Sequence, residues 1–70
     1  MSVLKVIELV GSSPSSWEEA TKNAIDKAAE TLRDITGADV VGQTVVVKNG
    51  AIVEYRVDVK VAFVVGGDVG

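Results

Sequence analysis

Charged and apolar residues alternate almost without a break between positions 54 and 63, EYRVDVKVAF. A period of two residues is typical of a β-strand with one buried face. The apolar set, which we expect to cover the core, is Tyr55, Val57, Val59, Val61 and Phe63. The charged set, which we expect on the opposite face, is Glu54, Arg56, Asp58 and Lys60. The pattern predicts a strand over 51–65.

A second strand-like run, 38–48, precedes this one and is separated from it by Asn49-Gly50. Asn-Gly is the strongest short signal for a β-hairpin, because a type I′ turn needs positive φ at both central residues. A two-residue turn pairs Lys48 with Ala51.

Counting back from this turn predicts the register of the hairpin. It places Gln43 opposite Arg56 and Asp39 opposite Lys60, with Asp58 a diagonal neighbour of Asp39. A bulge at Gly42 would shift the far half of the pairing by one residue.

The first half of the chain predicts one strand and one helix. Residues 3–10 are mostly β-branched and stop at Gly11, which indicates a short strand. Ser15 and Ser16 each stand three residues before a glutamate, Glu18 and Glu19, which gives two overlapping capping-box candidates, so a helix should start here. Apolar residues at spacings of three and four continue to Ile35 and predict a helix of about five turns. We expect Gly37 to end it.

The elements therefore follow the order strand, helix, strand, strand. We predict an α+β fold of type β-α-β-β, in which a three-stranded antiparallel sheet wraps around one helix and one sheet face has no cover within the chain. Residues 1–65 should form a single domain, and 66–70 a flexible tail.

Composition indicates that the chain needs support from other subunits. Its 70 residues are 47% hydrophobic and include no cysteine and no histidine, so neither disulfides nor a structural zinc can supplement a small core. Oligomerisation is therefore the expected way to supplement the core. The net charge of −3 with scattered basic residues excludes a typical nucleic-acid binder, and no apolar run reaches the ~20 residues that cross a bilayer. We expect a soluble, cytoplasmic protein with no membrane partner.

Catalysis has little support in the sequence. Without histidine or cysteine, and with no serine beside an evident base, nucleophilic triads are excluded. We therefore expect a protein that is not an enzyme.

The stretches KVIELVGSSPSSWEEA, ADVV and EYRVDVKVAF, in this order, resemble the dodecins across nearly the whole chain. The resemblance implies a hollow homododecamer of bacterial or archaeal origin that stores or sequesters a small ligand. The best-known members of the family bind flavins (FMN, FAD or riboflavin) between subunits.

Two positions depart from the flavin-binding pattern. A tryptophan that stacks on the flavin would align with Gly37, and a glutamine that hydrogen-bonds its ring would align with Arg56. A family branch with SPxSW at the helix start, an arginine in the third strand and an association with calcium matches this sequence better. The resemblance therefore favours calcium over flavin.

The predicted ligand-binding positions are Gly37, Gln43 and Arg56, and the predicted metal ligands are Asp39 and Asp58. Two alternatives stay open: Arg56 forms an ion pair, and the two aspartates are neutralised by neighbouring basic residues. Flavin sequestration and a purely structural oligomer also stay open as functions.

Overall fold

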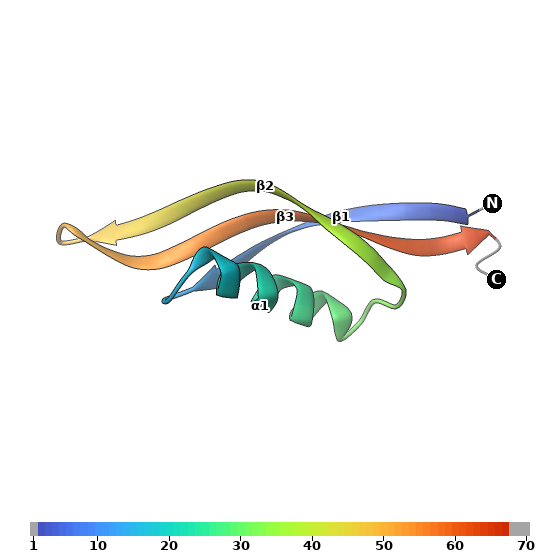
Figure 1. Ribbon diagram of the computed structural model, residues 1–70, viewed down its shortest axis with the longest axis horizontal. Helices are drawn as coiled ribbons and strands as arrows, with labels where there is room; N and C mark the ends of the chain where they lie inside the picture. The colour runs from blue at the N-terminus through green and yellow to red at the C-terminus, as the bar shows by residue number, and fades with distance from the viewer. Residues whose placement is uncertain (1, 68–70) are drawn as a thin grey trace.

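A computed structural model describes residues 2–67. It contains four elements in the predicted β-α-β-β order (Figure 1): β1 (Ser2–Ser13), α1 (Trp17–Ala29), β2 (Ile35–Lys48) and β3 (Ala51–Gly67). The three strands form one antiparallel sheet in the order β1-β3-β2, so β3 is central. The predicted fold class is confirmed.

The core lies between α1 and one face of the sheet. Val57, Val59 and Val61 of β3 are fully buried beneath the helix, and Phe63 is nearly so. The helix contributes Ala20, Ala24 and Ala28. The alternation of β3 is thereby confirmed, because its apolar residues face α1 and its charged residues lie on the sheet face that the chain leaves uncovered.

Gly11 determines how closely the helix approaches the sheet. A Cβ atom at this position would lie 2.1 Å from the carbonyl oxygen of Ala20 and 2.9 Å from the Cβ of Ala24. The prediction that β1 ends at Gly11 is wrong, because the strand continues to Ser13. The glycine serves close packing of α1 on β1 instead of a turn.

The helix starts where the capping signals predicted, and of the two candidates Ser16 is the N-cap. Its hydroxyl accepts a hydrogen bond of 3.0 Å from the backbone N–H of Glu19. The hydroxyl of buried Ser13 donates to the Glu19 carboxylate at 2.8 Å. The bond to Ser16 satisfies a backbone N–H that a helix start otherwise leaves unpaired, and the bond from Ser13 ties the first helical turn to the end of β1.

The end of the helix differs from the prediction, because α1 stops at Ala29 and not at Ile35. Asp34 takes a positive φ of 58°, its carbonyl accepts a hydrogen bond from the N–H of Val64, and Ile35 pairs with Phe63. Ile35, the last residue of the apolar stripe, therefore lies in the sheet and pairs with β3 instead of continuing the helix. Gly37 lies within β2 and is not the helix stop.

The hairpin turn is confirmed, with φ of 52° at Asn49 and 76° at Gly50 and with Lys48 paired to Ala51. The register beyond it is wrong by one residue over the middle of the hairpin. An irregularity next to Val47 displaces the pairing, and a second one between Val40 and Gly42 restores it.

These two bulges change the partners of residues used in the site predictions. Arg56 faces Thr44 instead of Gln43, whereas Asp39 faces Lys60 as predicted. Because a one-residue slip moves a side chain to the other face, Gln43 lies on the helix side of the sheet, opposite Val57.

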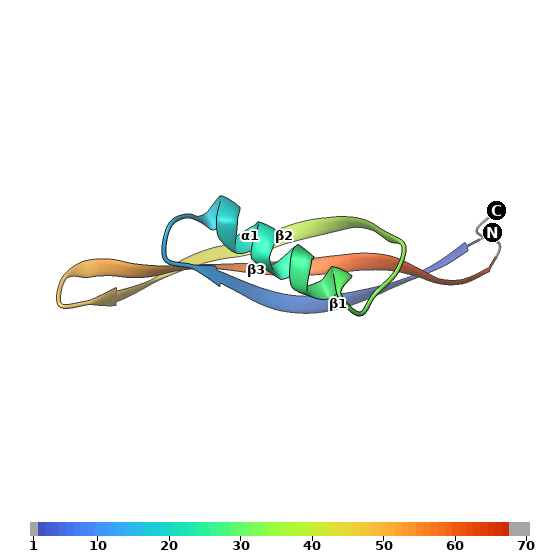
Figure 2. The same cartoon turned by 90° about the horizontal axis from the view of Figure 1, so that it is seen from below.

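The sheet is longer than the helix that covers it, and the body measures 52 × 19 × 14 Å (Figure 2). Beyond the N-terminus of α1 the β2–β3 hairpin continues as a two-stranded arm, and at the other end β1 and β3 continue together past the start of β2. β3 includes residues 66 and 67 of the predicted tail. Residues 68–70 lie outside the described part of the chain.

Candidate ligand site on the uncovered sheet face

The sheet face opposite the helix carries a belt of charged side chains. β1 and β3 bring Glu8 opposite Lys60 and Val10 opposite Asp58, and β2 brings Asp39 to the other side of Lys60. We call Glu8, Asp39, Asp58 and Lys60 the charged belt. It crosses all three strands near the middle of the sheet.

Two carboxylates of the belt lie close together. A hydrogen bond with the Asp58 side chain, followed by the repulsion of its negative charge, raises the pKa of Glu8 above its ordinary value, while Lys60 opposes the shift. When Glu8 is protonated, its carboxyl donates to Asp58. The buried Oδ1 atom of Asp58 has no hydrogen-bond partner among residues 2–67. Such a pair requires a proton or a cation.

The predicted metal ligands Asp39 and Asp58 both lie in the charged belt: Asp39 is opposite Lys60 on β2, and Asp58 is two residues before Lys60 on β3. The carboxylate that interacts with Asp58 is, however, Glu8 of β1. The sequence-based prediction missed Glu8 because the long connection through α1 leaves the register of β1 against β3 undetermined. The only signal was its place as one of two polar residues within residues 3–10.

The residues predicted to bind an organic ligand do not come together. Gly37 lies in β2 opposite Ala62, on the uncovered face, and a Cβ there would meet nothing within 4 Å. The side chain of Arg56 is on the same face, where its Nε donates to the Glu54 carboxylate. Gln43 lies on the other face, so the three residues cannot line one site within a single chain.

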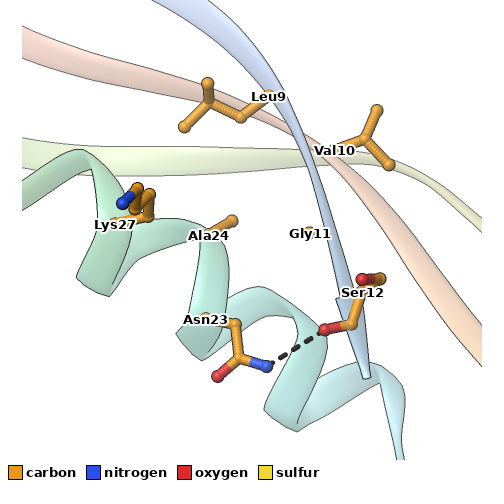
Figure 3. A pocket seen from close by; sticks show the side chains of 7 residues that line it. All are labelled: Leu9, Val10, Gly11, Ser12, Asn23, Ala24 and Lys27. Atoms are coloured by element: carbon orange, nitrogen blue, oxygen red, sulfur yellow. Dashed lines mark hydrogen bonds between the residues drawn. The ribbon is translucent and has the colours of Figure 1, made fainter. Parts of the chain in front are cut away.

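A groove of about 250 Å³ lies elsewhere, at the outer edge of β1 beside α1 (Figure 3). The side-chain amide of Asn23 crosses it to donate a 3.0 Å hydrogen bond to the carbonyl of Ser12. Its one charged side chain is Lys27, which pairs with Glu30 at 3.2 Å. The groove therefore offers few free polar groups that could orient a ligand.

Two further properties limit the functional options. Within residues 2–67 no three side chains of the metal-binding types histidine, cysteine, aspartate or glutamate gather into one cluster. No helix in this part of the chain has the length and apolar character needed to span a membrane.

Comparison with known proteins identifies the family. The Dodecin family model matches residues 3–66. The chain belongs to the dodecin family. It is 40% identical over 63 residues to the calcium dodecin of Mycobacterium tuberculosis, and the matched region covers 90% of this chain and 89% of that relative.

Solved dodecin structures agree with this assignment. The dodecin of Streptomyces coelicolor superposes with a TM-score of 0.90 at 27% identity and covers 96% of both chains. The crystal structure of the M. tuberculosis calcium dodecin, described as containing a novel calcium-binding site, gives a TM-score of 0.80 at 41% identity over 89% of both chains. The dodecin resemblance of the sequence is thereby confirmed.

Proposed function

We propose that this dodecin forms a non-enzymatic, homo-oligomeric shell that binds calcium on the uncovered sheet face. The observation that carries the proposal is the buried, unpaired Oδ1 atom of Asp58 beside the Glu8 carboxylate. A divalent cation would offset the repulsion between the two adjacent carboxylates, which Lys60 also opposes. The similarity to a calcium dodecin supports the same choice of ion.

The donor set of the belt fits a hard cation. Carboxylate oxygens are the ligands that calcium prefers, and Glu8 and Asp58 together offer four of the six to eight oxygens that calcium takes. Asp39 lies on the far side of Lys60 and does not join these two carboxylates in one cluster. Because the described residues contain no cluster of three acidic side chains, water or carboxylates of other subunits must complete the shell of ligands.

Flavin fits less well. Gly37 provides no ring on which an isoalloxazine could stack, and an aromatic stacking pair contributes about 0.5–1.5 kcal/mol beyond the area that it buries. The guanidinium of Arg56 is held by Glu54. A glycine and an ion-paired arginine therefore replace the two contacts that the dodecin resemblance assigns to flavin.

Calcium titration of paired variants tests the proposal. Calcium should raise the melting temperature of the protein, since a ligand that binds only the folded state stabilises it by mass action, and a chelator should reverse the gain. Asp58→Asn should abolish the gain, Glu8→Gln should reduce it strongly, and Asp39→Asn should reduce it less.

Asp26→Asn is the matched control, because Asp26 is an exposed helix residue that pairs with Lys22 away from the belt. It should leave the calcium effect unchanged. A calcium effect that survives in Asp58→Asn would place the ion elsewhere, and no effect in the parent protein would refute calcium binding.

Riboflavin separates the flavin alternative from this proposal. A flavin-storing dodecin would quench the fluorescence of added riboflavin at micromolar protein concentration. We expect no quenching. Stoichiometric quenching would instead restore flavin sequestration as the function.

A further inference from the structure

Lys60 provides the positive charge of the charged belt. In the sheet it stands opposite Glu8 of β1 on one side and opposite Asp39 of β2 on the other. Directly opposite residues on one sheet face have Cβ atoms about 4.5–5.5 Å apart. The ammonium of Lys60 ends a flexible four-carbon stem, so it can turn toward the carboxylate of either neighbour.

This ammonium is not committed to either carboxylate. Lys60 is exposed, and the three ion pairs among residues 2–67 do not include it. Its charge nevertheless acts on the belt. The hydrogen bond with Asp58 and the charge of Asp58 raise the pKa of Glu8, and the positive charge of Lys60 opposes that rise. Lys60 is therefore a mobile positive charge beside the Glu8–Asp58 carboxylate pair.

We propose that Lys60 is an internal counterion that competes with calcium for the carboxylate pair of Glu8 and Asp58. When the ion binds, the ammonium moves to Asp39 on the other side of β3. The inference rests on the proposed calcium site and specifies what limits its affinity. Without the ion, the ammonium offsets the repulsion within the pair. With the ion bound, the ammonium and the ion repel each other, so the ammonium turns away.

The charges of the belt support this division of roles. A divalent ion on the carboxylate pair and an ammonium beside Asp39 give each positive charge its own carboxylates. Asp39 stands across Lys60 from Glu8, and no three acidic side chains within residues 2–67 gather into one cluster. Asp39 therefore fits the role of acceptor for Lys60 better than the role of a calcium ligand.

The calcium affinity of Lys60→Met tests the competition, because methionine keeps most of the length of the side chain and removes its charge. A unit charge about 7 Å from a divalent ion weakens binding several-fold at the dielectric constants of a protein surface, so the variant should bind calcium about five-fold more tightly than the parent. The affinities are measured by titration against a competing calcium indicator at one ionic strength.

Two control variants separate the position of the charge from its presence. Lys60→Arg keeps the charge in place and should bind calcium within about two-fold of the parent. Lys48→Met removes an equal charge from the strand end next to the hairpin turn, far along β2 from the belt. It should also stay within about two-fold, because salt screens charges separated by more than about 10 Å.

Thermal stability separates competition from a purely structural role of Lys60. In chelator, Lys60→Met should melt at a lower temperature than the parent, because the carboxylate pair loses the charge that offsets its repulsion. The rise in melting temperature on addition of calcium should nevertheless be larger in the variant, because tighter binding stabilises the folded state more. A purely structural role would lower both melting temperatures and leave the rise unchanged.

Asp39→Asn, made alone and together with Lys60→Met, tests where the ammonium goes. Alone, it removes the second partner of Lys60 and should weaken calcium binding about three-fold, since the ammonium then stays at the carboxylate pair. In the Lys60→Met background the same change should weaken binding less than about two-fold, because only a screened charge is lost. A double-mutant cycle measures this dependence.

The outcomes distinguish this inference from the proposed function. Unchanged or weaker calcium binding by Lys60→Met would overturn the competition and leave the calcium site standing. Equal weakening by Asp39→Asn in both backgrounds would show that Asp39 acts directly on the ion and overturn its role as acceptor. Calcium binding by Lys60→Met alone would support the competition and refute calcium binding by the parent. No binding by either protein would overturn both.

Discussion

Replacing Gly11 by alanine tests the packing that holds α1 on the sheet. The added Cβ would lie 2.1 Å from the carbonyl oxygen of Ala20, whereas nonbonded heavy atoms attract most strongly at about 3.5 Å. It would also lie 2.9 Å from the Cβ of Ala24. Both contacts belong to the helix backbone or to a side chain too short to move away. The helix must therefore shift outward by roughly 1 Å.

The cost of this shift follows from what the helix covers. Ala20 and Ala24 pack directly against Val57 and Val59, and these residues form most of the buried core. Overpacking a core costs about 1–3 kcal/mol, and a helix displaced as a whole places Gly11→Ala at the upper end, about 3 kcal/mol. For a domain of this size each kcal/mol lowers the melting temperature by about 4–8 °C, so we expect a loss of roughly 12–24 °C.

Gly37→Ala is the matched control, since a Cβ there meets nothing within 4 Å and the residue is not in the positive-φ region. It should change stability by no more than about 0.5 kcal/mol. Thermal unfolding of both variants is followed by circular dichroism at one subunit concentration, because oligomerisation couples stability to concentration. If Gly11→Ala melts within a few degrees of Gly37→Ala, the close helix–strand contact described here is incorrect.

Three further predictions concern single contacts. Because the pKa of Glu8 is raised, the stability that Glu8 contributes is fully present below its ordinary pKa of 4.5 and is lost as the pH rises through the raised value. In the presence of a chelator, the Glu8→Gln variant should therefore melt at a higher temperature than the parent protein at pH 7 and at the same temperature at pH 3. Identical pH profiles of the two proteins would argue against the carboxylate pair. Ser16→Ala should lower the free energy of unfolding by about 1 kcal/mol, because the N-cap hydrogen bond is lost. Ser15→Ala should lower it little, because the Ser15 hydroxyl makes no hydrogen bond within residues 2–67. Equal losses of stability in the two variants would contradict this capping assignment. Gly50→Ala should lower the free energy of unfolding by about 1–2 kcal/mol, because φ is 76° at this position. Gly42→Ala should leave stability unchanged, because the position has open space and no positive φ. Equal urea midpoints for the two variants would refute the turn assignment.

Strong local patterns predicted most of the fold. The alternation in β3 identified both of its faces, because a strand with one buried side leaves a period of two in the sequence. Asn49-Gly50 identified the hairpin, since few other residues take positive φ at two successive positions. Both signals reside in neighbouring residues and need no knowledge of distant contacts.

The errors arise where distant contacts override local patterns. Leu32 and Ile35 continue the apolar stripe of the helix, but the pairing of Ile35 with Phe63 draws this segment into the sheet. Two compensating bulges moved Gln43 away from Arg56, and no residue type marks a bulge with certainty.

The candidate site was predicted only in part. Asp58 lies in β3, where charged and apolar residues alternate, and Asp39 lies in the neighbouring strand β2. Their presence on the uncovered face could therefore be inferred from the hairpin. Glu8 could not, because its approach to Asp58 depends on the register of β1 against β3, which is set by the packing of α1 and Gly11.

Native mass spectrometry of the purified protein, with and without a chelator, tests the central claim most directly, since it reports the number of subunits and any retained ion together. We predict a dodecamer of the 7.3 kDa chain that carries calcium and loses it in Asp58→Asn. A single 7.3 kDa species would contradict the shell, and a dodecamer that retains no calcium, or retains it in Asp58→Asn, would contradict the proposed site.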